Sequence, residues 1–212
     1  QSSYGRDAAA VLAAAVAEAM RPNATVADVV ETALRLAKDA TRSAIEAVVE
    51  TAVGLDGWRS GGLAELRSAF APFDSVGEPY ASPAQNARIP SRLHSIEELP
   101  LALGLLVATG GDYAETVLGG VNYGRDSDSI ASMGGALAGA LGGSAVLRRD
   151  WVDEVSRASR IDIEEAGRTM ADVAVEILER DTQRHEERVR AIRELTAAQM
   201  SATQVPADGV PA

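Results

Sequence analysis

The chain has 212 residues and a formal net charge of −11, and 46% of its residues are hydrophobic but only 4% aromatic. The acidic excess excludes a general nucleic-acid binder, because affinity for phosphates depends on surplus Lys and Arg. The absence of cysteine excludes disulfides, thiolate metal sites and cysteine nucleophiles, and two histidines are too few for a multi-histidine zinc site. With few aromatic side chains, the core must be built from many close contacts between Ala-rich helices.

The first 70 residues carry apolar side chains at helical spacing, which predicts four helices. The expected helices are one over 7–20, one from Thr25 to about Lys38, one capped by Asp39 or Thr41 and ended by Gly54, and one within 58–70. Thr25 with Asp28 three residues later is typical of a partial capping box.

Residues 71–92 interrupt the helical pattern. The segment contains four prolines: Pro72, Pro79, Pro83 and Pro90. A structureless stretch of this length inside a compact chain is either a functional lid or a linker. Because helices of similar character resume after it, we favour a lid or pocket wall.

Five further helices are expected in the second half of the chain, where Gly110 and Gly111 mark a break. They start at Ser95 with Glu98 as a capping partner, at Asp112 with Glu115, at about Ile130, at Asp150 and at Asp162, and the one from Asp150 to Val155 is either a brief helix or a turn. The last should run to about Leu195, with a buried stripe made of Met170, Val173, Ala174, Ile177 and Leu178. We therefore predict an all-α fold, with one domain over 1–200 and a disordered tail over 201–212.

The uncharged run 130–147 has almost the length of a membrane span. It is rich in Gly and Ala, so its hydrophobicity on a transfer scale is weak. Charged residues flank it on both sides. We interpret the run as a helix buried in protein, and expect a cytoplasmic protein with neither a membrane nor a nucleic acid as partner.

Three hard oxygen ligands lie within four residues just before this helix: Asp126, Asp128 and Ser129. Such oxygens suit Mg²⁺ or Ca²⁺, and the two carboxylates would overcome the repulsion between a cation and the positive end of a helix dipole. Gly124 permits a tight turn before them. The alternative is an ordinary helix N-cap, since Asp and Ser are favoured there. The spacing alone leaves both interpretations open.

The same residues resemble a known family. The segment 122–131 and the Gly/Ala run 134–143 are similar to the C-terminal signature of the ADP-ribosylglycohydrolase family, in which Gly-x-Asp-x-Asp-Thr/Ser leads into a Gly/Ala helix. The resemblance extends to 95–100, to Asp112-Tyr113 and to the opening Ser3-Tyr4-Gly5, and covers about 1–155.

This resemblance implies an all-α hydrolase, an orthogonal multi-helix bundle of the family's type. It also implies two Mg²⁺ ions and cleavage of the glycosidic bond at ribose C1″. Asp126, Asp128 and Ser129 would be metal ligands. Ser3, Tyr4 and Gly5 would contact the substrate, an ADP-ribosyl group on a modified residue or a small molecule. Tyr123, beside the metal-binding segment, is our candidate for a further substrate contact; the competing interpretation is that it packs under the Gly/Ala helix.

The sequence departs from the family pattern in its missing acidic residues. The chain contains no Asp-Asp pair, so further metal ligands and a catalytic carboxylate are not identifiable, and Lys38-Asp39 stands where many members have histidine. We therefore expect the chain to be the C-terminal part of a hydrolase that acts with an N-terminal half, either a second chain or a missing segment. The alternatives are a non-catalytic, crystallin-like or ligand-binding relative, and a ribosyl N-glycosidase of specialised metabolism.

Overall fold

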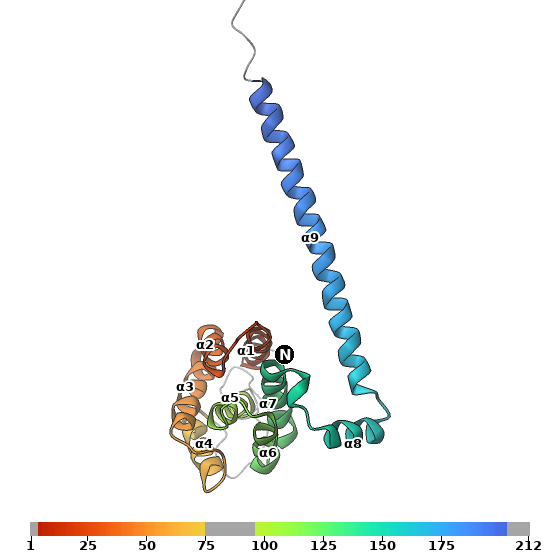
Figure 1. Cartoon of the computed structure of the whole chain (residues 1–212). Helices are drawn as coiled ribbons and strands as arrows, with labels where there is room; N and C mark the ends of the chain where they lie inside the picture. The colour runs from red at the N-terminus through yellow and green to blue at the C-terminus, as the bar shows by residue number, and fades with distance from the viewer. Residues whose placement is uncertain (1–3, 75–95, 203–212) are drawn as a thin grey trace, which may run out of the picture. The chain divides into compact units, whose positions relative to one another are not determined.

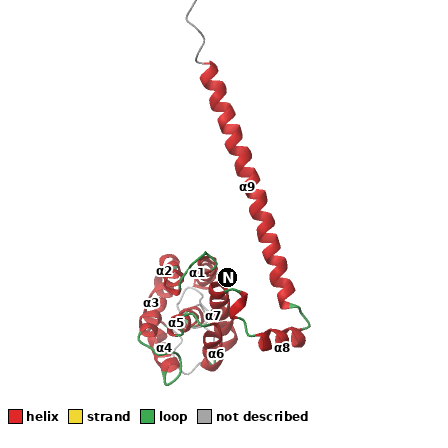
Figure 2. Cartoon of the chain, in the orientation of Figure 1, coloured by secondary structure: helices red, strands yellow, loops and turns green. Residues whose placement is uncertain are grey.

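The computed structural model describes residues 4–74 and 96–202, and within these ranges the predicted all-α fold is confirmed. The described residues form nine α-helices and two short 3₁₀ helices, with no strand among them (Figure 2). In chain order the α-helices are α1 (Tyr4–Ala19), α2 (Val26–Leu36), α3 (Asp39–Val53), α4 (Gly62–Phe70), α5 (Glu98–Ala108), α6 (Tyr113–Tyr123), α7 (Ser127–Gly142), α8 (Arg149–Ser159) and α9 (Ile163–Ala202). The 3₁₀ helices are η1 (Ala71–Phe73) and η2 (Ser144–Val146).

The chain divides into two compact units, Gln1–Arg149 and Asp150–Ala212. The buried hydrophobic side chains of the described residues all lie in the first unit, between Val11 and Ala138. The predicted extent of a single domain over 1–200 stays a prediction.

Helix α5 is the centre of the first unit. Its residues from Leu99 to Leu106 are all buried, and it lies among the other helices of the unit (Figure 1). One core cluster joins it to α1, α2 and α7 through residues such as Leu103 and Leu137. A second cluster joins it to α3, α4 and α7 through residues such as Leu101 and Ile130. A helix buried on all sides explains why this segment is apolar around its whole circumference.

The Gly/Ala character of α7 serves close packing against α6, as the sequence suggested. A Cβ on Gly134 would lie 2.9 Å from the Cγ2 of Thr116, and one on Gly120 of α6 would lie 2.7 Å from the Cα of Ala131. Both distances are too short for a side chain. The two helices can approach this closely only because glycine occupies both positions.

Several helix ends follow their local signals. Thr25 and Asp28 form a full capping box, with Asp28 Oδ2 accepting from Thr25 N at 2.8 Å and Thr25 Oγ1 accepting from Asp28 N at 3.2 Å. Asp112 accepts from the backbone N–H of Glu115 and caps α6. Helix α3 ends at Val53, with Gly54 as its C-cap, as expected.

Two predicted caps are wrong. The N-cap of α3 is Lys38, which makes no side-chain cap, and Asp39 is the first helical residue. A tertiary contact defines this start, because the Lys38 backbone N–H donates to Asp7 Oδ2 of α1 at 3.2 Å. The N-cap of α5 is Glu97 instead of Ser95. Ser95 itself lies outside the described residues, and so do most of the expected lid and most of the expected tail.

The predicted burial of a stripe on the last helix is also wrong. Met170 is 68% and Leu178 is 67% exposed, and Val173, Ala174 and Ile177 are exposed as well. Apolar periodicity showed that one face of α9 is apolar, but it contains no information about what covers that face. In the part of the chain that the structure describes, no helix is both long enough and apolar enough to cross a membrane.

Candidate functional site at the start of helix α7

The predicted metal-binding segment forms the turn between α6 and α7 and the first turn of α7. Gly124 has φ 79° and Arg125 has φ 54°, so two consecutive residues adopt positive φ. Glycine accepts this geometry freely, whereas Arg125 is strained in it. The turn brings Asp126 to the N-cap position and places Asp128 and Ser129 in the first helical turn.

Asp126 occupies a capping position without acting as a cap. Its side chain accepts no hydrogen bond from the backbone N–H groups of α7. Its Oδ1 accepts instead from Ser129 Oγ at 3.0 Å, and the side chains of Asp126 and Asp128 are exposed. In contrast, Asp112 at the start of α6 caps its helix through the side chain. The Asp126 carboxylate is therefore held by Ser129 and stays accessible to a ligand.

The structure adds Glu98, the first residue of α5, to this group. Burial raises the pKa of the Glu98 carboxyl to about 7, and the negative charges of Glu97 and Asp126 and a hydrogen bond with the Asp126 side chain add to the effect. Sequence reasoning missed this residue because it assigned Glu98 to a capping box. The available signal was a pair of adjacent acids at the start of an apolar helix.

Glu97, beside Glu98, is a buried carboxylate with several donors. It is 2% exposed. Its Oε1 accepts from the Tyr123 hydroxyl at 2.7 Å and from Arg125 Nη1 at 3.2 Å. Sequence reasoning also missed this group, since the partners are 26 and 28 residues away along the chain.

Tyr123, the predicted substrate contact, is 4% exposed. The Arg67 guanidinium lies 4.5 Å from the centre of its ring, and Arg67 Nε donates to its hydroxyl at 3.2 Å. Burial, followed by the hydrogen bond to Glu97, raises the pKa of Tyr123 above its ordinary value. These contacts are those of a packed residue. A role for Tyr123 in substrate binding stays a prediction.

The predicted substrate residues Tyr4 and Gly5 open helix α1, and Ser3 lies outside the described residues. Tyr4 lines a cavity of about 520 Å³ together with Arg6, Asp7, Ala10, Lys38 and Asp39. The cavity therefore lies between the first residues of α1 and the start of α3. The residues described as lining it do not include Asp126, Asp128 or Ser129.

The chemistry of the residues at the start of α7 can be compared with the needs of Mg²⁺. Asp126, Asp128, Ser129 and Glu98 offer only oxygen donors, which are the ligands that Mg²⁺ prefers. Among residues 4–74 and 96–202, however, no group of three or more His, Cys, Asp or Glu side chains is arranged to hold a metal ion. The donor chemistry of these side chains therefore fits Mg²⁺, but the described residues do not form a metal site by themselves.

Comparison with known proteins gives one match. The family model of the ADP-ribosylglycohydrolases matches residues 1–187, which extends the resemblance beyond residue 155. Comparison with curated proteins and with solved structures gives no match. The family model covers the whole first unit and much of α9, so the α6–α7 turn and α7 lie within the matched range. The chain therefore belongs to the ADP-ribosylglycohydrolase family.

Proposed function

We propose that the protein is a Mg²⁺-dependent hydrolase that cleaves a ribosyl glycosidic bond and releases ADP-ribose from a modified residue or a small molecule. One observation carries the proposal: Asp126 stands at the start of α7 without capping it. A carboxylate kept for local stability would accept a backbone N–H, as Asp112 does. Membership of the family supports a different role for the Asp126 carboxylate, as a ligand for a cation.

In the proposed site, Asp126, Asp128 and Ser129 hold Mg²⁺, with Glu98 as a neighbouring oxygen donor. Bound Mg²⁺ would orient the ribose hydroxyls and lower the pKa of a bound water. The hydrogen bond from Ser129 orients the Asp126 carboxylate before the ion arrives. In its protonated form the Glu98 carboxyl can donate a hydrogen bond to the Asp126 side chain, and ionisation of Glu98 would add a second negative charge for a dication.

We propose that the cavity beside Tyr4 receives the diphosphate end of the substrate. Arg6 and Lys38 line it, and cationic side chains of this kind bind phosphates by charge-assisted hydrogen bonds. The remaining metal ligands would come from a partner segment, the N-terminal half expected from the sequence. The incomplete ligand shell of the described residues supports this arrangement.

The proposal predicts that the Asp126→Asn and Asp128→Asn variants each lose Mg²⁺-dependent turnover. The amide removes the negative charge that holds the cation but keeps the shape of the side chain, so the helices should remain folded. The assay measures release of ADP-ribose from an ADP-ribosylated arginine peptide in Mg²⁺ and in EDTA, with the N-terminal half of a family member supplied in trans.

The control for this assay is Asp162→Asn. Asp162 accepts from the backbone N–H of Glu165 at 2.9 Å, and Asn replaces Asp well at such a position. This variant should keep its turnover. Full turnover by either Asp126→Asn or Asp128→Asn would show that the metal assignment is wrong.

A second candidate is a non-catalytic, ligand-binding relative of the family. The incomplete set of metal ligands among the described residues favours it. Calorimetric titration with ADP-ribose separates the candidates: binding without any Mg²⁺-dependent release of ADP-ribose from the peptide would support the non-catalytic relative.

A further inference from the structure

Four side chains from separate parts of the chain meet beneath the α6–α7 turn: Arg67, Glu97, Tyr123 and Arg125. Glu97 accepts from the Tyr123 hydroxyl and from Arg125 Nη1, at 2.7 and 3.2 Å. Arg67 of α4 donates to the Tyr123 hydroxyl at 3.2 Å and to the Tyr123 backbone carbonyl at 2.9 Å. These contacts connect α4, the start of α5 and both ends of the turn.

The burial of Glu97 means that its carboxylate needs these particular partners. A carboxylate as buried as Glu97 is stable only when its hydrogen bonds are satisfied and an opposite charge lies near. Arg125 supplies the charge, and its own side chain is only 27% exposed. Reaching Glu97 keeps Arg125 at φ 54°, a conformation that disfavours arginine. The ion pair therefore compensates for backbone strain at the residue immediately before Asp126.

We propose that Glu97 and Arg125 are positioning residues, which fix the α6–α7 turn in the one conformation that presents Asp126 and Asp128 together to a cation. This inference rests on the proposed metal-binding role of those two aspartates. Because Arg125 directly precedes Asp126, a change in the backbone at Arg125 redirects the Asp126 side chain. Neither positioning residue needs to touch the ion or the substrate.

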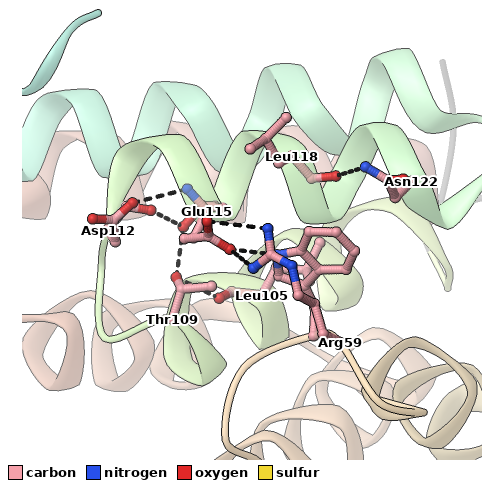
Figure 3. Close-up of polar contacts among 9 residues, drawn as sticks. Arg59, Leu105, Thr109, Asp112, Glu115, Leu118 and Asn122 are labelled. Carbon is pink, nitrogen blue, oxygen red and sulfur yellow. Dashed lines mark hydrogen bonds and ion pairs between the residues drawn. The ribbon is translucent and has the colours of Figure 1, made fainter.

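The chain offers a matched control at the other end of α6. Glu115 accepts from Trp58 Nε1 at 3.0 Å and forms an ion pair with Arg59, so it also joins α6 to a distant segment (Figure 3). Its partners lie in the segment before α4. Asp112 caps α6 beside it, and the α6–α7 turn is not part of this group (Figure 3). A Glu115→Gln variant removes a carboxylate that also pairs with an arginine, without touching the turn, although Glu115 is more exposed than Glu97.

The test uses the full chain with Mn²⁺ as the probe for the Mg²⁺ site, and follows free Mn²⁺ by electron paramagnetic resonance. Glu97→Gln and Arg125→Asn should each weaken Mn²⁺ binding by about 10- to 100-fold, the range found when partners of metal ligands are changed. Asn tolerates positive φ well, but it leaves the buried Glu97 without its ion-pair partner, so Arg125→Asn should lower the thermal midpoint as well as the affinity. Glu115→Gln should change the midpoint more than the affinity.

A purely structural role would make the loss of affinity follow the loss of thermal midpoint in the same way in Arg125→Asn and Glu115→Gln. Mn²⁺ affinity within twofold of the wild type in Glu97→Gln and Arg125→Asn would overturn the inference, and so would an affinity loss in Arg125→Asn that is matched by an equal loss in folded Glu115→Gln.

A second measurement does not depend on the metal. In EDTA, amide hydrogen exchange over 124–130 should accelerate at least about tenfold in Glu97→Gln, and exchange over 113–120 should stay unchanged. If the wild-type chain alone binds no Mn²⁺, the metal site needs the ligands of the proposed partner segment, and exchange alone decides the inference. Unchanged exchange at the turn would then refute the positioning role.

Discussion

At the scale of single residues, the Glu98 carboxyl combines burial with a second carboxyl group beside it. Its pKa is raised from 4.5 to about 7, because burial and the neighbouring negative charges disfavour the ionised form. The folded chain therefore holds the proton more tightly than the unfolded chain. The contribution of this group to stability is complete below about pH 4.5 and is lost as the pH rises through about 7.

This linkage predicts a pH-dependent effect of the Glu98→Gln substitution. In metal-free buffer at pH 8, the variant should have a free energy of unfolding on the order of 2 to 3 kcal/mol above that of the wild type, because the amide avoids the burial of a charge. At pH 4 the two proteins should be equally stable, since Glu98 is then protonated in both states. Urea unfolding at several pH values measures the difference, and a gap that does not vary with pH would contradict the assigned cause.

At the scale of helices, the contact between α6 and α7 sets the geometry of the turn that joins them. A Cβ at Gly120 would lie 2.7 Å from the Cα of Ala131. Because this contact is with backbone, a side chain at position 120 would force α6 and α7 apart. At Gly139, on the same helix as Ala131, a Cβ would lie 3.8 Å from the Tyr113 ring, which is an ordinary contact.

The two glycines therefore predict opposite effects of the same substitution. Gly120→Ala should lower the free energy of unfolding by about 1 to 3 kcal/mol through overpacking. Gly139→Ala should raise the free energy of unfolding by about 0.5 to 1 kcal/mol, because alanine reduces the conformational entropy of the unfolded chain. Chemical denaturation of both variants checks the pair, and equal effects would show that α6 and α7 are not in backbone contact.

At the scale of the whole molecule, the buried core and the charged C-terminal helices form separate units. The buried hydrophobic side chains of the described residues end at Ala138, and α8 has no buried residue. A chain of residues 1–149 should therefore fold cooperatively and keep a thermal midpoint within about 5 °C of the full chain, since it contains every buried hydrophobic side chain of the described residues. Calorimetry checks this expectation. Loss of a cooperative transition would show that residues beyond 149 complete the core.

The uncovered apolar face of α9 marks where sequence reasoning reached its limit at this scale. The periodicity of Met170, Val173 and Ile177 correctly predicted a long helix with one apolar face. The prediction that the face is buried was wrong, because periodicity reports the arrangement of side chains around one helix axis and not the presence of a partner.

The sequence by itself determined the all-α class, most helix starts and the family. Capping residues, glycines and apolar spacing act within one or two helical turns, so they can be recognised from neighbouring positions alone. The segment Asp126–Ser129 was recognisable for the same reason. The sequence left open whether Asp126 caps α7 or serves a ligand.

Only the tertiary structure excluded a side-chain cap by Asp126 and identified the residues grouped around it. It showed that the Asp126 side chain does not cap α7, placed Glu98 beside it, and brought Arg67 to Tyr123 across 56 residues. It also buried Glu97 beneath the turn and opposite Arg125. Contacts over such separations depend on how the helices pack, and packing is a property of the whole core instead of any local run of residues.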